Sequence, residues 1–266
     1  DAITVRPVDS SIGVNISVEK AFAAYENGTP IPEIAEHFAD AVEKGFRESP
    51  QVDLESLSDY EQMKSKLSME VVSAEKNAEL LESVPHERME DMAVVYRFVL
   101  DQTDSGNGTI LVTNQLLDQY GITKEQLRAD AMENAPEIRP SEIRGMSEVM
   151  SELAPGMIPE VAPEDEQMFV ATVPDKIHGA GVIAYPNFME DAAQKMGGDF
   201  FVLPSSIHEV LLVKDNGQMT AKELENMVKE VNATQVEPAD QLTDHVYHYD
   251  SQNHIFELAD KYEERQ

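Results

Sequence analysis

The sequence predicts a fold that mixes sheets with packed helices, of class α+β or α/β, and three observations carry this prediction. Apolar residues recur at helical spacing in one long segment, where Ile34, Phe38, Val42 and Phe46 form a single stripe. Short runs rich in β-branched and aromatic residues recur elsewhere, and from residue 168 onwards they alternate with helical segments. Two such runs near the end of the chain flank a polar turn, which predicts a terminal β-hairpin.

The first half of the chain is predicted to contain a strand pair, several helices and a β-hairpin. Thr29 and Pro30 supply an N-cap and a first-turn proline for the long amphipathic helix. The turn Asp104–Gly108 tolerates positive φ, so the strands on either side of it are predicted to pair. Met146 and Met150 stand at helical spacing and are interpreted as adaptable core residues. Strands are predicted over residues 3–8, 12–17, 67–72, 92–100 and 109–113.

The second half is predicted to alternate strands with helices before the terminal hairpin. Thr220 and Glu223 match a capping box, which predicts the start of a helix. For the terminal hairpin, Tyr249 is taken to pair with His254 across the turn. Strands are predicted over residues 168–173, 179–185, 200–203, 210–213, 245–249 and 254–258, and helices over 188–196 and 220–231.

A change of composition in the middle of the chain suggests a division into two parts. Residues 153–167 combine prolines and a glycine with an acidic triplet, which is typical of a linker. We therefore expect an N-terminal α+β part over residues 1–152 and a C-terminal α/β part over residues 168–266. The sequence leaves open whether the two parts pack as one unit.

The charge of the chain excludes several classes of partner. It carries 51 acidic against 20 basic side chains, a net charge of −31 at pH 7, and the acidic residues are spread evenly. Phosphate backbones and anionic membrane surfaces are repelled by such a surface, so we expect no direct nucleic-acid or membrane partner. The chain has no cysteine, which suits a reducing compartment, and shows no secretory signal, so the expected location is the cytoplasm.

The segment Pro204–Glu209 carries the strongest candidates for a catalytic site. Ser205, Ser206, His208 and Glu209 bring hydroxyl, imidazole and carboxylate groups together within this segment. Ser206 and His208 would share a face on an extended chain, which permits a nucleophile and a base to meet but does not by itself build a triad. The alternative is that the proline and the serines form the turn between two strands, with ordinary polar residues after it.

The sequence predicts no cofactor and no confident metal site. The chain has seven histidines, of which His86 and His208 are weak candidates for metal ligands because nothing in the sequence brings them together. Gly179 and Gly181 belong to a fragment of a glycine-rich loop, but a third glycine and a following helix are missing, so dinucleotide binding is disfavoured. These two glycines are interpreted as the start of a strand that approaches a neighbour closely.

Eight short segments occur in a characteristic order along the chain: Tyr25–Gly28, Asn77–Leu81, Val84–His86, Asp91–Tyr96, Tyr120–Thr123, Leu203–Leu211, Val228–Asn232 and Val246–Tyr249. Together they resemble a bacterial domain-of-unknown-function family, numbered 5688, over nearly the whole chain. The resemblance implies a bacterial or mobile-element origin and carries no assigned activity.

The expected function is that of a non-catalytic binding or interaction module in the cytoplasm, because no complete catalytic set is present in the sequence. Its partner, a protein or a small molecule, and its oligomeric state cannot be read from the residues. One alternative is a hydrolase that uses Ser205 or Ser206 with His208. Another is an acidic mimic of nucleic acid that binds a basic partner, although evenly scattered carboxylates do not favour it.

Overall fold

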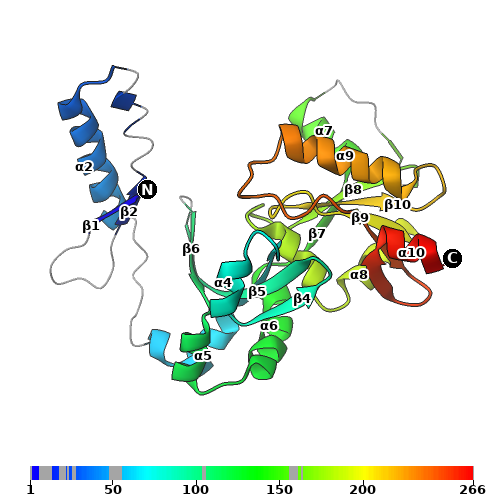
Figure 1. The fold of residues 1–266 in the computed structure, drawn as a ribbon, viewed down its shortest axis with the longest axis horizontal. Coiled ribbons are helices and arrows are strands. Elements are labelled where there is room, and N and C mark those ends of the chain that lie inside the picture. The colour runs from blue at the N-terminus through cyan, green and yellow to red at the C-terminus, as the bar shows by residue number, and fades with distance from the viewer. Residues whose placement is uncertain are drawn as a thin grey trace. The chain divides into compact units, whose positions relative to one another are not determined.

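The computed structural model describes residues 2–5, 14–17, 22, 24–25, 28–47, 56–103, 106–155, 161–162 and 164–265. The chain divides into two compact units, one of residues 1–53 with 101–108 and one of residues 54–100 with 109–266 (Figure 1). The candidate site lies entirely in the second unit. None of the helices in the described ranges is long and apolar enough to cross a membrane.

The first unit contains a strand pair and one long helix. Strands β1 (Ala2–Val5) and β2 (Val14–Ser17) are antiparallel, as the sequence predicts. Helix α2 (Ile31–Arg47) follows Thr29 and Pro30 and includes Ile34, Phe38 and Val42 of the predicted apolar stripe. Of the predicted segments around this unit, residues 6–13 and the turn residues 104 and 105 lie outside the described part of the chain.

The second unit begins with a four-stranded antiparallel sheet, in which β5 is paired with β3 on one side and with β4 and β6 on the other. Its strands are β3 (Leu67–Ser73), β4 (His86–Met89), β5 (Met92–Thr103) and β6 (Gly106–Leu111). Residues 101–103 of β5 and 106–108 of β6 are counted with the first unit. The helices around it are η1 (Ser56–Ser58), α3 (Tyr60–Met63), η2 (Lys64–Lys66), α4 (Ala78–Ser83), α5 (Asn114–Tyr120) and α6 (Lys124–Ile138).

A six-stranded antiparallel sheet, in the order β12-β11-β9-β10-β8-β7, forms the rest of this unit. The strands are β7 (Glu142–Gly145), β8 (Met168–Thr172), β9 (Phe200–Leu203), β10 (Val210–Lys214), β11 (Tyr247–Asp250) and β12 (Ile255–Leu258). The helices are α7 (Met146–Leu153), η3 (Gly179–Ala184), α8 (Phe188–Met196), α9 (Ala221–Thr234) and α10 (Ala259–Arg265). Helices α7 and α9 lie on the same face of the sheet (Figure 1).

One hydrophobic core runs through both sheets of the second unit. It includes Met69 and Tyr96 of the four-stranded sheet together with Phe169 and Leu212 of the six-stranded sheet, all of them buried. Strand β7 precedes the proline-rich segment 153–167 and pairs with β8, which follows it. Residues 156–160 and 163 of that segment lie outside the described residues. The chain on its two sides therefore shares one sheet and one core.

The predicted strand over residues 179–185 is wrong, because these residues form the 3₁₀ helix η3. A short apolar run has no periodicity that separates a strand from a buried helix, and only the surroundings decide between them. The predicted close approach of the two glycines is correct. A Cβ atom on Gly179 would lie 2.5 Å from the carbonyl oxygen of His208, and one on Gly181 would lie against the carbonyl oxygen of Met69.

The terminal hairpin is present, with a different register from the predicted one. Tyr249 of β11 pairs with Phe256 of β12, whereas His254 belongs to the turn. The four-residue turn is shifted by one position, to residues 251–254, where the carboxylate of Asp250 accepts hydrogen bonds from the backbone amides of Gln252 and Asn253. The predicted capping box at Thr220 and Glu223 is present at the start of α9.

Candidate functional site

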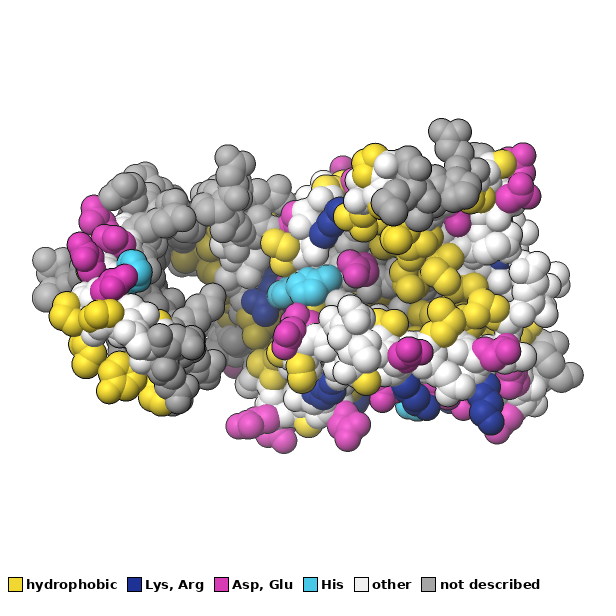
Figure 2. Space-filling view, turned by 90° about the horizontal axis from the view of Figure 1, so that it is seen from above, with side chains coloured by type: hydrophobic (Ala, Val, Ile, Leu, Met, Phe, Trp, Pro, Cys, Tyr) yellow, Lys and Arg dark blue, Asp and Glu magenta, His cyan; other side chains and the backbone are white. Residues whose placement is uncertain are grey.

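A groove of about 760 Å³ lies between helices α7 and α9. Its floor includes Val170 of β8 and Leu211 of β10, which are register partners on one face of the sheet. Figure 2 looks down on this face and shows hydrophobic side chains gathered in the hollow, with histidine side chains beside one end of it. A volume of this size is typical of a small-molecule site.

Helix α7 turns an apolar stripe towards the groove. Met146, Val149, Met150 and Leu153 follow one another at helical spacing, and all four line the groove. No residue of α7 is buried, and the side chain of Leu153 is 76% exposed. The prediction that Met146 and Met150 are core residues is therefore wrong. Helical spacing identifies an apolar face but does not show whether another part of the protein covers it.

The polar end of the groove is formed by the segment that the sequence singled out. Ser205, Ser206, His208 and Glu209 all line the groove, next to Asp240. The segment is anchored to the chain after α9, because the backbone amide of Ile207 donates to the carbonyl oxygen of Asp240 at 2.8 Å. The structure thus brings the four predicted site residues together at one place.

The Ser206 hydroxyl and the His208 ring are engaged with different partners. The hydroxyl oxygen of Ser206 accepts a hydrogen bond from the backbone amide of His208 at 3.0 Å, and Ser206 is only 7% exposed. The Nδ1 atom of His208 accepts a hydrogen bond from the backbone amide of His178 at 3.2 Å. The serine therefore closes the turn in this conformation, while the imidazole faces a second histidine.

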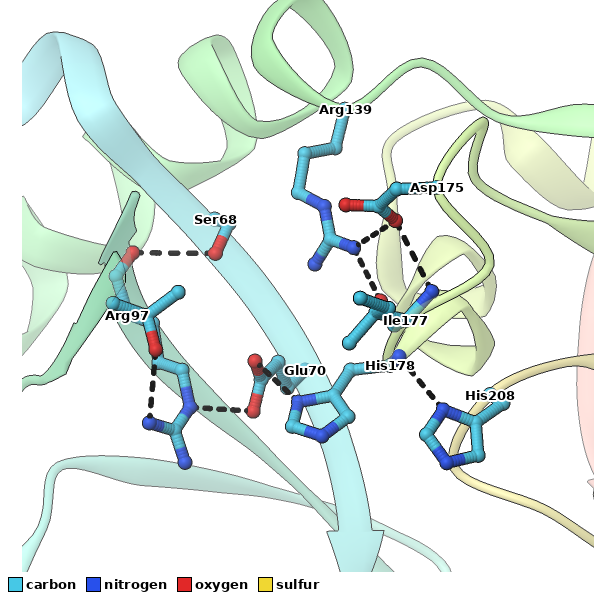
Figure 3. Close-up of polar contacts among 9 residues, drawn as sticks. Ser68, Glu70, Arg97, Arg139, Asp175, Ile177, His178 and His208 are labelled. Carbon is cyan, nitrogen blue, oxygen red and sulfur yellow. Dashed lines mark hydrogen bonds and ion pairs between the residues drawn. The ribbon is translucent and has the colours of Figure 1, made fainter. Parts of the chain in front are cut away.

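His178 is the functional candidate that sequence reasoning missed. Its ring lies 5.6 Å from the ring of His208, measured between centroids, and the two planes are tilted by 35°. Its Nδ1 atom is 2.8 Å from Oε1 of Glu70, a residue of strand β3 that is 108 positions away (Figure 3). No local pattern connects residues at that separation. The position before Gly179 and Gly181 is the only hint that the sequence contains.

Glu70 is a buried carboxylate with a partner on each oxygen. Its side chain is 5% exposed, and its second oxygen accepts a hydrogen bond from Nε of Arg97 at 2.7 Å. Burial by itself would raise the pKa of this carboxyl group. The hydrogen bond and charge of His178, together with the charge of Arg97, outweigh burial and hold the pKa of Glu70 below its ordinary value of 4.5. Glu70 is therefore ionised at neutral pH and orients the ring of His178.

The loop that carries His178 is held in an unusual conformation. Lys176 and His178 both have positive φ, at 56° and 52°, although neither is a glycine. The buried side chain of Arg139 donates through Nη2 to the carboxylate of Asp175 at 2.6 Å and to the carbonyl oxygen of Ile177 (Figure 3). Backbone strain of this kind persists where surrounding contacts enforce it, and it is concentrated at functional sites.

The two weak metal candidates do not come together. His86 lies on β4 and its Nδ1 atom contacts the carbonyl oxygen of Val84, whereas His208 faces His178. Within the described ranges, no group of three or more histidine and acidic side chains is arranged to hold a metal ion.

The buried pair of Glu70 and Arg97 leads to a prediction about stability against pH. Because the pKa of Glu70 is lower in the folded than in the unfolded protein, its contribution is complete above about pH 4.5 and is lost as the pH falls through the folded value. We expect Glu70→Gln to lower the free energy of unfolding at pH 6, and the difference from the wild type to shrink between pH 5 and pH 3. Urea unfolding followed at a series of pH values measures it.

The matched control for this prediction is Glu87→Gln. Glu87 lies on β4 of the same sheet, and its half-buried carboxylate pairs at 2.9 Å with Arg128, whose side chain is exposed. Because exposed ion pairs contribute only about 0–1 kcal/mol, the difference from the wild type should be small at every pH. A difference for Glu70→Gln that stays constant from pH 6 to pH 3 would contradict the prediction.

Comparison with known protein families gives a match. The model of a family of unknown function, DUF5688, matches residues 1–251. No curated protein and no solved structure matches significantly. The match covers nearly the whole chain and agrees with the resemblance noted in its short ordered segments. The chain therefore belongs to DUF5688, a family of unknown function.

Proposed function

We propose that the protein binds a small neutral amphipathic molecule, with its aliphatic part in the α7–α9 groove and its polar head at Ser205 and His208. The observation that carries this proposal is the apolar stripe of α7, which lines the groove and contains no buried residue. Covering such a stripe with a ligand removes apolar surface from water, at about 25 cal/mol per Å².

The lining of the groove favours an aliphatic chain over a ring. Its apolar residues are valine, leucine and methionine, and no phenylalanine, tyrosine or tryptophan stands among the described residues that line it. Aromatic ligands gain from stacking on rings, which this wall does not offer. Methionine adapts its shape to a flexible chain.

The charges that line the groove disfavour an anionic head group. They are four carboxylates, of Glu142, Glu209, Glu237 and Asp240, and two cations, Arg144 and Lys176, of which Arg144 is already paired with Glu148 and Glu152 of α7. An anionic head would meet more carboxylates than cations. The proposal places the protein in the cytoplasm, because the chain has no cysteine, and retains the bacterial or mobile-element origin that the family resemblance suggests.

Titration of the protein with decanol by isothermal calorimetry tests this proposal. We expect saturable binding, and we expect Leu153→Asp to weaken it by at least about tenfold, because burial of a leucine side chain contributes about 1.5–3 kcal/mol. Leu153 is exposed in the free protein, so the fold should tolerate the change.

The matched control is Ile31→Asp, which changes an apolar side chain that is 66% exposed in helix α2 of the other unit. Its affinity for decanol should equal that of the wild type. The proposal is wrong if decanol gives no saturable heat, or if the Leu153→Asp and Ile31→Asp variants bind it equally well.

A further inference from the structure

The two histidines beside the groove are set in complementary tautomers. Glu70 is ionised and accepts from Nδ1 of His178, so the neutral ring of His178 carries its proton on Nδ1 and a lone pair on Nε2. A backbone amide can only donate, so Nδ1 of His208 carries the lone pair and its Nε2 carries the proton. When both rings are neutral, Nε2 of His178 is therefore a hydrogen-bond acceptor and Nε2–H of His208 is a hydrogen-bond donor.

Both of these Nε2 atoms lie on the same side of the pair. In Figure 3 the second ring nitrogen of each histidine is turned away from Arg139. Nε2 of His178 makes no hydrogen bond to any residue that the structure describes. Nε2 of His208 is 3.5 Å from Asp240, too far for a strong hydrogen bond. Both rings are about one third exposed. A base and a hydrogen-bond donor are therefore accessible beside the polar end of the groove.

We propose that His178 and His208 form a hydrolytic site for neutral carboxylic esters of aliphatic acids, with His178 as the general base and His208 as the donor to the carbonyl oxygen. The inference rests on the proposed function, since the acyl chain would occupy the α7–α9 groove. Glu70 and Arg97 are positioning residues that fix the tautomer and direction of the His178 ring.

The reaction follows from these assignments. Nε2 of His178 takes a proton from a water molecule while the water oxygen forms a bond to the acyl carbon, and the carbonyl π electrons move to oxygen. The Nε2–H group of His208 donates to that oxygen, a role that a neutral imidazole can fill. The bond to the alkoxy oxygen then breaks, and the leaving alkoxide takes the proton from His178. Water and ester give acid and alcohol, without an oxidant or reductant.

The residues around the two histidines disfavour phosphate esters as substrates and a serine as the nucleophile. Carboxylates outnumber cations among the residues that line the groove, so a phosphate ester, which is anionic before it reacts, is repelled on binding, whereas a carboxylic ester binds as a neutral molecule. Among the described residues, no imidazole nitrogen contacts the hydroxyl group of Ser205 or Ser206 to take its proton, so water rather than serine is assigned as the nucleophile.

Hydrolysis of p-nitrophenyl octanoate by the full chain tests the proposal. We expect turnover in the wild type and a fall in kcat of about 100-fold or more in His178→Gln, since a general base typically contributes 10²–10⁴-fold. His86→Gln, a histidine on β4 away from the groove, is the matched control and should keep the wild-type rate.

The Glu70→Gln variant tests whether Glu70 positions the His178 ring for catalysis or only stabilises the fold. Its kcat should fall at least tenfold while KM changes by less than about twofold, because the groove is untouched. Product release should show no initial burst of p-nitrophenol, because no acyl-enzyme forms.

The decanol titration distinguishes failure of this inference from failure of the proposed function. The histidine pair is not catalytic if the wild type binds decanol but does not hydrolyse the ester. The same conclusion follows if His178→Gln binds decanol and hydrolyses the ester as the wild type does. In both cases the groove still binds decanol, so the proposed function stands. A stoichiometric burst of p-nitrophenol would overturn direct attack by water. If decanol does not bind, the proposed function fails first.

Discussion

Gly181→Ala is expected to lower the free energy of unfolding of the second unit by about 3 kcal/mol or more, the upper end of the usual cost of overpacking, because buried backbone must move. The new Cβ atom would lie against the carbonyl oxygen of Met69 and 3.1 Å from Cα of Glu70. Both contacts are backbone atoms of β3, so no side-chain rotation relieves them. Thermal unfolding measures the effect, and the melting temperature should fall by about 10 °C or more.

Gly217→Ala is the matched control for this prediction. Gly217 has a φ of +74°, and a Cβ atom there would meet no atom within 4 Å. Alanine at this position therefore lowers the free energy of unfolding only through its unfavourable left-handed backbone conformation. That cost is about 1–2 kcal/mol. If the two variants lose equal stability, the close packing of η3 against β3 is not what holds this part of the fold.

Arg139→Ala is expected to cost about 2–4 kcal/mol, because the Arg139 side chain is only 5% exposed and holds the His178 loop through two acceptors. Removal of the guanidinium group breaks its hydrogen bond to the carbonyl oxygen of Ile177 and its ion pair with the carboxylate of Asp175. Urea unfolding measures the loss.

Arg144→Ala provides the comparison, since Arg144 also bonds two acceptors, Glu148 and Glu152, whose side chains are 60% exposed. Exposed ion pairs contribute about 0–1 kcal/mol, so this variant should stay within about 1 kcal/mol of the wild type. Equal losses in the two variants would show that burial of Arg139 does not matter for the loop.

The parts of the fold that the sequence predicts well depend on neighbours along the chain. The start of α2 after Thr29 and Pro30, the capping box of α9 and the strand runs of β5, β9 and β10 all follow from residues a few positions apart. The segment 204–209 could be singled out for the same reason, because its polar residues are adjacent.

The errors arise where distant segments meet. Residues 179–185 have a strand-like composition, yet they form η3 because they pack against β3 and β8. Met146 and Met150 have the spacing of core residues, and only the position of α9 and the sheet shows that they line a groove.

The sequence by itself determined the mixed α and β composition, the strongly acidic surface and the cluster of polar residues around His208, because composition and local periodicity encode these features. The tertiary structure decided the site. It placed Glu70 and Arg97 beside His178, and His178 beside His208, across separations along the chain that no local pattern spans. The tautomers of the two rings follow from those contacts, since a carboxylate accepts and a backbone amide donates.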